Sequence, residues 1–303
     1  MRGDLSSLEV ARPRRLAEAL ALLAEPERPT PLAGGTDLFV LLNDGKQPSR
    51  RFLDLTLLDE LRGIERSPAG IRLGARTTYA ELRRSRTIHS RAPILAEMAA
   101  TVGAAAIQNR GTLGGSLGNA SPASDPAPVL LVLDAAVELA RRIGRRVERR
   151  VVPLSSFFID YRKTAARPDE LVTAILIPAA ALSGWRYAYR KVGTRRAQAI
   201  SKVVAAAGVS TPGRARERTA ARIAFGSVAP TTVRASAAEG AIAGRRLDAA
   251  AAGEARTVLL SRDLRPIDDL RSTAEYRAVV SGRILVAMLA ELGGFPAAPL
   301  LDR

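Results

Sequence analysis

The sequence predicts an α+β fold, in which strands and helices are mixed but do not alternate as regular β-α-β units. Two observations support this class. Short strand patterns recur along all 303 residues, and helical patterns of unequal length separate them. The composition is 47% hydrophobic and 25% charged, which provides enough apolar material for large buried cores. The length allows one long domain or two or three small ones.

The first elements are a helix, a strand and a second helix. Within residues 16–24, Leu16, Leu20 and Leu23 share one helical face. Residues 30–33 follow as a short strand, and Gly34 and Gly35 then lead into an apolar helix over residues 36–42. The sequence therefore predicts a strand-glycine-helix unit near the N-terminus.

The next part of the chain is predicted to be mainly helical. Residues 71–73 form a strand pattern, and Thr78 with Glu81 matches a capping box at the start of a helix. Pro93 suits the first turn of a further helix, which we expect to end between residues 103 and 108.

Residues 111–128 form the longest stretch rich in Gly, Ser, Asn and Pro. Apolar patterns flank it on both sides, so we expect an anchored functional loop, with a free linker as the alternative. The basic run at residues 141–150 lies between two short apolar stretches and predicts the exposed tip of a hairpin.

The last third of the chain returns to strands. We expect them over residues 171–177, 199–209 and 222–225, with a loop at residues 191–196 and a domain boundary near residues 179–184.

A strong helix closes the chain after alanine-rich helical patterns. Ser272 and Glu275 form a capping-box pattern at its start. The residues predicted to form its buried face are Tyr276, Val280, Ile284 and Met288.

The composition excludes several kinds of site. There is no cysteine and only one histidine, His89, which rules out a side-chain-ligated iron–sulfur cluster, a Cys-based zinc site, a disulfide framework and a Cys nucleophile. Redox activity would therefore require a bound organic cofactor. We assign no metal ligands and no catalytic residues.

The net charge is +16, and all but four of the 46 basic residues are arginines spread over the whole chain. Aromatic residues make up only 4%, so no platform for base stacking is visible and we expect no nucleic-acid partner. No apolar stretch reaches the roughly 18 residues of a membrane-spanning helix, and no signal peptide is recognisable. We therefore expect a soluble, cytoplasmic protein without a membrane span.

Two glycine-rich loops, LAGGTDL at residues 32–38 and GTLGGSLGNASPASD at residues 111–125, are candidates for phosphate binding. Glycine permits positive φ and lets backbone N–H groups approach an anion. Neither loop matches a P-loop or the G-x-G-x-x-G pattern. An ordinary tight turn is the alternative for either loop alone, whereas together they predict two turns that close on one diphosphate.

Neutral hydrogen-bonding side chains surround these glycines, and they suit phosphate or sugar oxygens: Thr36, Thr112, Ser116, Asn119 and Ser124. Because a carboxylate repels a diphosphate, we expect Asp37 to cap the following helix. The same repulsion assigns Asp125 to a sugar or to a ring N–H.

Six motifs occur in order: AGGTDL; QNRGTLGGSLGNASPASDPAPVL; FFIDYRKT with PDELVTAILIP; YRKVGTRRAQAISKV; IAFGSVAPT; and PIDDLRSTAEYR. In this spacing the chain resembles the FAD-binding subunit of the molybdenum hydroxylases, the family of xanthine dehydrogenase and aerobic carbon monoxide dehydrogenase. The resemblance runs from about residue 5 to about residue 292. ASPASD and YRKVGTRR resemble the xanthine dehydrogenase-like members more.

The resemblance implies a PCMH-type FAD-binding fold of two subdomains, residues 1–60 and 61–178. A smaller C-terminal α+β domain would follow at residues 185–303. The PIDD segment, Pro266 to Asp269, is expected to be a structural turn.

The resemblance also implies a set of FAD-binding residues. The diphosphate would be held by Leu32, Ala33, Gly34, Gly35 and Thr36, beside Asp37, together with Thr112, Gly114, Gly115 and Ser116. Asn119, Ser124 and Asp125 would reach the ribityl chain and the isoalloxazine. Val172, for which a purely structural place in a strand is the alternative, would approach the ring, as would Arg190 or Lys191; which of these two faces the flavin stays open. His89 lies outside every motif, so we expect it to be exposed and the FAD to be non-covalent.

The implied function is electron transfer. An iron–sulfur subunit would deliver electrons from a molybdenum-cofactor subunit, and this chain would pass them through FAD to NAD or another acceptor. A self-sufficient flavin-dependent reductase or oxidase is the alternative, and a basic nucleic-acid-binding protein is a more distant one.

Overall fold

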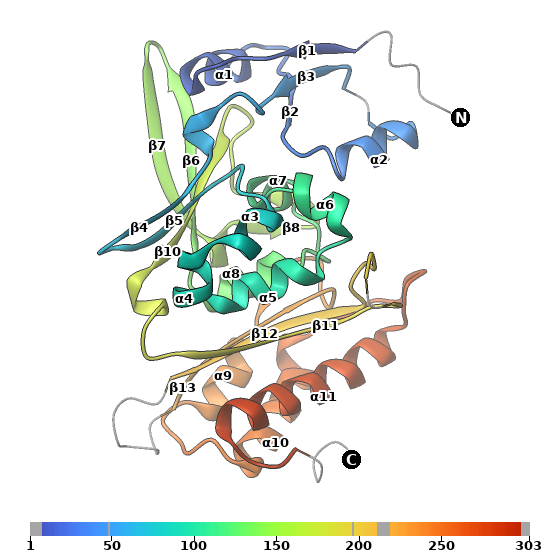
Figure 1. Ribbon diagram of the computed structural model, residues 1–303. Helices are drawn as coiled ribbons and strands as arrows, with labels where there is room; N and C mark the ends of the chain where they lie inside the picture. The colour runs from blue at the N-terminus through green and yellow to red at the C-terminus, as the bar shows by residue number, and fades with distance from the viewer. Residues whose placement is uncertain (1–7, 48, 196, 211–218, 298–303) are drawn as a thin grey trace.

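The computed structural model describes residues 8–47, 49–195, 197–210 and 219–297. Within these residues, a three-stranded, a five-stranded and a four-stranded sheet follow one another along the chain, with a two-stranded ribbon beside them. Helices α3 to α8 lie between the second and third large sheets (Figure 1). The arrangement confirms the predicted α+β class.

The three-stranded sheet has the order β1-β3-β2 and all its pairs are parallel. The elements of this region are β1 (Glu9–Ala11), α1 (Leu16–Leu23), β2 (Thr30–Leu32), α2 (Leu38–Asn43) and β3 (Arg51–Asp54). The strand-glycine-helix unit is confirmed. Asp37 occupies the position before α2, but its side chain makes no capping hydrogen bond, so the predicted capping role is wrong.

The five-stranded sheet has the antiparallel order β4-β5-β10-β6-β7. Its strands are β4 (Ile64–Ser67), β5 (Gly70–Gly74), β6 (Ala136–Ile143), β7 (Arg146–Pro153) and β10 (Leu171–Pro178), and the short ribbon is β8 (Phe158–Asp160) with β9 (Lys163–Thr164). The predicted hairpin is confirmed: β6 and β7 pair on either side of Gly144, whose φ of +57° suits the turn.

Six short helices connect β5 to β6: α3 (Tyr79–Arg84), α4 (Arg86–Arg91), α5 (Pro93–Thr101), α6 (Ala105–Arg110), α7 (Leu113–Asn119) and α8 (Pro126–Val132). The capping box is confirmed, because the Thr78 hydroxyl accepts from the Glu81 amide while the Glu81 carboxylate accepts from the Thr78 amide. The helix that begins at Pro93 ends earlier than predicted, because Val102 is extended.

The glycine-rich stretch is only partly a loop. Residues 113–119 form α7, whose first turn is stabilised because the Thr112 hydroxyl accepts from the Gly115 amide. The prediction of a loop over residues 111–128 was therefore wrong for this segment and for the start of α8. The high glycine content favoured a loop, although the Thr112 cap begins a helix there.

The four-stranded antiparallel sheet is covered on both faces. It contains β11 (Arg186–Val192), β12 (Val203–Ser210), β13 (Ala220–Gly226) and β14 (Val233–Arg234). Helices α5 and α8 pack on one face, whereas α9 (Ser236–Ile242) and α11 (Ala274–Gly293) pack on the other, with α10 (Ala249–Val258) beside them (Figure 1). Lys191 lies in β11, so the predicted loop starts later, at Gly193; Arg196 lies outside the described residues.

The final helix α11 is shifted by one residue from its prediction. Its cap is Thr273, whose hydroxyl accepts from the Tyr276 amide, and Tyr276 itself is 41% exposed. The buried face includes Arg277, Ser281, Leu285, Met288, Leu289 and Leu292. The sequence did not indicate this face because it includes Arg277, and arginine normally occupies a solvent-facing position.

The buried core continues across the predicted domain boundary. One cluster of apolar side chains joins the five-stranded sheet and helices α3, α4, α5, α7 and α8 to Val204, Ala206 and Ala224 of the four-stranded sheet. A second cluster fills the space under α9 to α11, and a third lies under α1. The proposed division into three units thus remains a prediction, and the two larger sheets share a core.

Candidate functional site

A cavity of about 500 Å³ opens between the N-terminal sheet and the helical layer. Both glycine-rich loops line it, together with residues 164–172 before and within β10. The predicted site residues in its wall are Leu32, Ala33, Gly34, Gly35, Thr36, Asp37, Thr112, Gly114, Gly115, Ser116, Asn119 and Val172. The two loops, distant in sequence, therefore converge on one space.

The two loops meet at backbone distance. A Cβ built on Gly34 would lie 1.9 Å from the carbonyl oxygen of Arg110, which is closer than any side chain tolerates. Gly35 has a φ of +75°, and this conformation disfavours any residue with a side chain. The first loop thus requires both glycines, one for close approach and one for its turn.

The backbone amides of the two loops are used differently. In the second loop, Leu113 N donates to Thr77 O at 3.0 Å and Gly114 N donates to Ala75 O at 2.8 Å. Gly115 N donates to the Thr112 hydroxyl. Among the described residues, the amides of residues 34–36 have no hydrogen-bond acceptor. The amides of residues 113–115 are thus engaged within the protein, whereas those of residues 34–36 in the first loop are free to bind a ligand.

Helix α7 presents a flat face to the cavity. Gly115 and Gly118, one turn apart, are both exposed, and a Cβ on Gly118 would meet no protein atom within 4 Å. The Ser116 hydroxyl lies 3.0 Å from that of Ser124, which connects Ser124 to the site from behind the wall. Nearby, burial raises the pKa of Tyr79, so this phenol stays protonated.

Two polar side chains at the mouth of the cavity, Asp37 and Asn119, interact with the same arginine, Arg162. Partial desolvation raises the pKa of the Asp37 carboxylate, although it remains exposed, and the positive charge of Arg162 opposes the shift. Arg162 also donates to the Asn119 side-chain oxygen at 2.8 Å. Arg162, in the turn between β8 and β9, therefore fixes the position of the Asn119 side chain at the mouth of the cavity.

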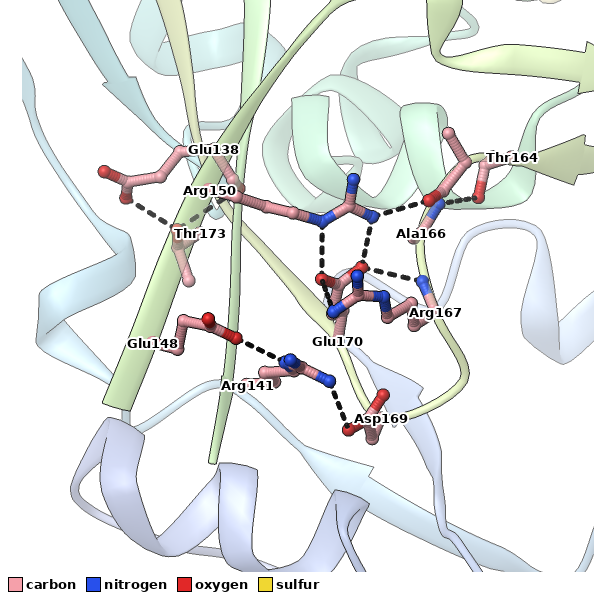
Figure 2. A network of polar contacts seen from close by, with 11 residues as sticks. Glu138, Arg141, Glu148, Arg150, Thr164, Ala166, Arg167, Asp169, Glu170 and Thr173 are labelled. Atoms are coloured by element: carbon pink, nitrogen blue, oxygen red, sulfur yellow. Dashed lines mark hydrogen bonds and ion pairs between the residues drawn. The ribbon is translucent and has the colours of Figure 1, made fainter. Parts of the chain in front are cut away.

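A buried carboxylate, Glu170, holds the segment of the cavity wall that precedes β10 (Figure 2). Arg150 of β7 donates to both oxygens of Glu170 at 2.6 and 2.7 Å and to the carbonyl of Ala165 at 2.7 Å. Glu170 also accepts from the Arg167 amide. Burial alone would raise the pKa of Glu170, but these donors outweigh it and lower the pKa.

A bulge in β10 brings Val172 to the cavity wall. The register with β6 shifts between Val172 and Ala174, and the extra residue, Thr173, donates to a Glu138 oxygen at 2.6 Å. The sequence analysis missed Arg150, Glu170 and Thr173. Their partners lie on other segments, and only the PDEL motif at residues 168–171 signalled this wall.

Four predicted site residues lie outside the cavity lining: Ser124, Asp125, Arg190 and Lys191. Lys191 donates to Asp125 at 2.6 Å, and both side chains are about nine-tenths buried. Ser201 donates to the other Asp125 oxygen at 2.5 Å. Burial raises the pKa of Asp125, whereas Lys191 and Ser201 oppose that shift. Arg190 instead forms an ion pair with Glu291 on α11.

The remaining expectations concern residues outside the motifs or in the PIDD turn. His89 is exposed, as predicted. Asp269 of the PIDD segment accepts from Arg277 at 2.7 Å and from the amides of Arg271 and Ser272. Asp268 accepts from the Ala274 amide. These contacts anchor the start of α11. Among the described residues, no group of three or more His, Asp or Glu side chains could hold a metal ion.

Two family models match the chain. The FAD binding domain in molybdopterin dehydrogenase matches residues 6–180, and the CO dehydrogenase flavoprotein C-terminal domain matches residues 187–292. The carbon monoxide dehydrogenase medium chain of Afipia carboxidovorans is 32% identical, over 92% of this chain and 94% of the relative. The xanthine dehydrogenase FAD-binding subunit of Escherichia coli O157:H7 is 29% identical, over 93% and 96%. These similar identities do not favour the xanthine dehydrogenase-like members.

Solved structures agree with the sequence matches. Carbon monoxide dehydrogenase of Hydrogenophaga pseudoflava contains a chain that superposes with a TM-score of 0.88 at 28% identity, covering 96% of this chain and 98% of that one. Quinoline 2-oxidoreductase of Pseudomonas putida 86 gives a TM-score of 0.86 at 25% identity, covering 99% and 100%. The chain therefore belongs to the family of FAD-binding flavoprotein subunits of the molybdenum hydroxylases, which are oxidoreductases.

Proposed function

We propose that the cavity between the glycine loops holds FAD without a covalent bond, and that the chain transfers electrons through it between partner subunits and a final acceptor. The observation that supports this most directly is the convergence of both loops on one cavity of about 500 Å³. The cytoplasmic location and the absence of a nucleic-acid partner remain predictions. Among the described helices, none has the length and apolar character that a bilayer crossing requires.

The residues present fit a dinucleotide. The unpaired amides of residues 34–36 are suited to diphosphate oxygens, since N–H donors without protein partners gain most from an anion. Gly115 and Gly118 leave room along α7 where side chains would fill the cavity. Thr36, Ser116 and Asn119 add neutral polar groups in the same wall.

FAD would supply the ability to accept electrons singly and to release them as a pair. The protein would position and shield it. Val172 and the segment held by Glu170 form one side of the cavity. Asp125 and Lys191 satisfy each other in this structure, so a role at the flavin requires that they exchange partners. Arg190, paired with Glu291, is less suited to that role than Lys191.

We further propose an iron–sulfur subunit and a molybdenum-cofactor subunit as partners, with NAD as a candidate acceptor. The names of the relatives, which include medium chains and FAD subunits of dehydrogenases, support the proposal of a multi-subunit complex. The chain has no cysteine and so cannot provide thiolate ligands for an iron–sulfur cluster itself.

The experiment that tests this is affinity purification of the chain from its native cells, followed by metal analysis. We expect iron and molybdenum to co-purify with it. Turnover of an organic substrate by the isolated flavin-loaded chain, with neither metal present, would instead support the self-sufficient reductase or oxidase.

A further inference from the structure

A second pocket lies on the other side of the contact between the two glycine loops. Its volume is about 310 Å³, and it shares four residues with the FAD cavity: Ala33, Gly34, Arg76 and Thr112. Much of its remaining wall comes from α3 and from the end of α6. We call it the arginine pocket, after Arg62, Arg76, Arg84 and Arg110 in its wall.

The arginine pocket has an excess of positive charge. Glu81 is the only carboxylate in its lining, and Asp59, outside the lining, lies 3.9 Å from Arg62. One Glu81 oxygen is already engaged, because it accepts from the Thr78 amide at 2.7 Å and from the Thr78 hydroxyl at 2.9 Å. Its other oxygen is 3.7 Å from Arg62. The capping box therefore engages one of the two oxygens of this carboxylate.

Two of the four arginines lack any partner in the described part of the chain. Arg84 and Arg110 are exposed, and their side chains make no hydrogen bond or ion pair within the described residues. Arg76 is half-buried and donates to the Leu58 carbonyl at 3.1 Å. Burial, and then repulsion from Arg62, lower the pKa of Arg76, so an anion placed between these cations would stabilise their charged forms.

We propose that the arginine pocket binds the phosphate groups of a nucleotide. Guanidinium groups present paired N–H donors that match phosphate oxygens, and four of them converge here beside the backbone of Gly34. The phosphates have two possible sources. One is the diphosphate of FAD, reaching across Gly34 from the cavity, and this source rests on the proposed function. The other is a separate phosphate-bearing molecule, such as a nucleotide that accepts electrons.

The test uses the full chain, with and without FAD, and inorganic pyrophosphate as the probe in calorimetric titrations at low ionic strength. The variant is Arg84→Gln with Arg110→Gln, which removes the two unpartnered cations. The control is Arg86→Gln with Arg91→Gln, an equal change of charge on exposed positions of α4 outside the pocket. We expect the first variant to bind pyrophosphate about tenfold more weakly or worse, and the control to bind like the wild type.

The two sources give different results. If FAD displaces pyrophosphate and the Arg84/Arg110 variant also loses flavin, the phosphates are those of FAD. If the FAD-loaded chain still binds pyrophosphate and the variant keeps its flavin, the ligand is a separate molecule.

The proposal is overturned if the wild type does not bind pyrophosphate, if the Arg84/Arg110 variant binds it equally well, or if the Arg86/Arg91 control loses binding to the same extent. A failure of the proposed function would be visible separately, as a wild-type chain that takes up no flavin in the same preparation.

Discussion

At the scale of single residues, the glycines of the two loops differ in what an added side chain would contact. At Gly34 it would collide with the Arg110 carbonyl, and at Gly114 with the backbone and Cβ of Ala75. Substitution at either position would therefore disturb the protein itself. At Gly118 a Cβ would meet no protein atom within 4 Å. A substitution at Gly118 can therefore reduce the space for the cofactor without disturbing the folding of the protein.

We predict that Gly118→Leu lowers the FAD content of the purified chain while raising its free energy of unfolding by about 0.5–1 kcal/mol, because leucine favours a helix more than glycine does. Gly240→Leu is the matched control. Gly240 is also an exposed helical glycine with no atom within 4 Å of its Cβ, but it lies in α9 outside the cavity. Flavin absorbance and urea unfolding give both quantities. Equal flavin content in the two variants would contradict the assignment of this cavity.

The buried pair of Asp125 and Lys191 gives a second prediction. Lys191→Met leaves a buried carboxylate without its cation, and we expect a loss of about 3–5 kcal/mol in the free energy of unfolding. Adding Asp125→Asn should recover much of this loss, because no uncompensated charge remains. Urea denaturation of the single and double variants measures the coupling. Additive losses would show that the two side chains do not interact.

At the scale of elements, the wall segment before β10 is held by one side chain from a strand distant in sequence. Glu170 accepts from Arg150 of β7 and from the Arg167 amide, and its own side chain is 2% exposed. Because its pKa is lowered on folding, the ionised form stabilises the native state. This contribution is present above the ordinary glutamate pKa of 4.5 and is lost as the pH falls through the lower folded value.

We therefore predict that Glu170→Gln lowers the free energy of unfolding by about 2 kcal/mol at pH 7. Because the Arg150 side chain is 35% exposed, solvent screens the ion pair, and the loss is smaller than for a fully buried pair. Below pH 4.5 the difference from the wild type should shrink. Glu275→Gln, at an exposed position in α11, is the control and should show little change at either pH. Urea unfolding at a series of pH values checks this. A difference that does not change with pH would exclude the ionised Glu170 as its cause.

The elements also show which features the sequence could predict. Capping and turn chemistry is local, so the Thr78–Glu81 box and the β6–β7 hairpin were predictable from adjacent residues. Helix α7 was not, because Thr112 caps a helix whose glycines suggested a loop. The register of α11 depended on Arg277, which is buried because distant groups, Asp269 and the Ser227 carbonyl, accept its hydrogen bonds.

The same distinction applies to the site. The glycine loops were recognisable because their residues are adjacent in sequence. The Arg150–Glu170 contact and the pairing of Lys191 with Asp125 join distant segments, so no local pattern specified them.

At the scale of the whole molecule, the cavity that we propose holds FAD lies between the N-terminal sheet and the helical layer, and one core then connects that layer to the C-terminal sheet. Binding of a dinucleotide across the cavity would therefore join the first region to the rest of the chain. A ligand that binds only the folded state raises its stability by mass action. FAD should thus stabilise the whole molecule against unfolding.

Flavin stoichiometry after purification, followed by acid precipitation, tests the central claim most directly. We predict a yellow chain with about one FAD per molecule, from which acid releases all of the flavin into the supernatant. A colourless chain that takes up no FAD on reconstitution would contradict the assignment of the cavity, and flavin that precipitates with the polypeptide would contradict non-covalent binding.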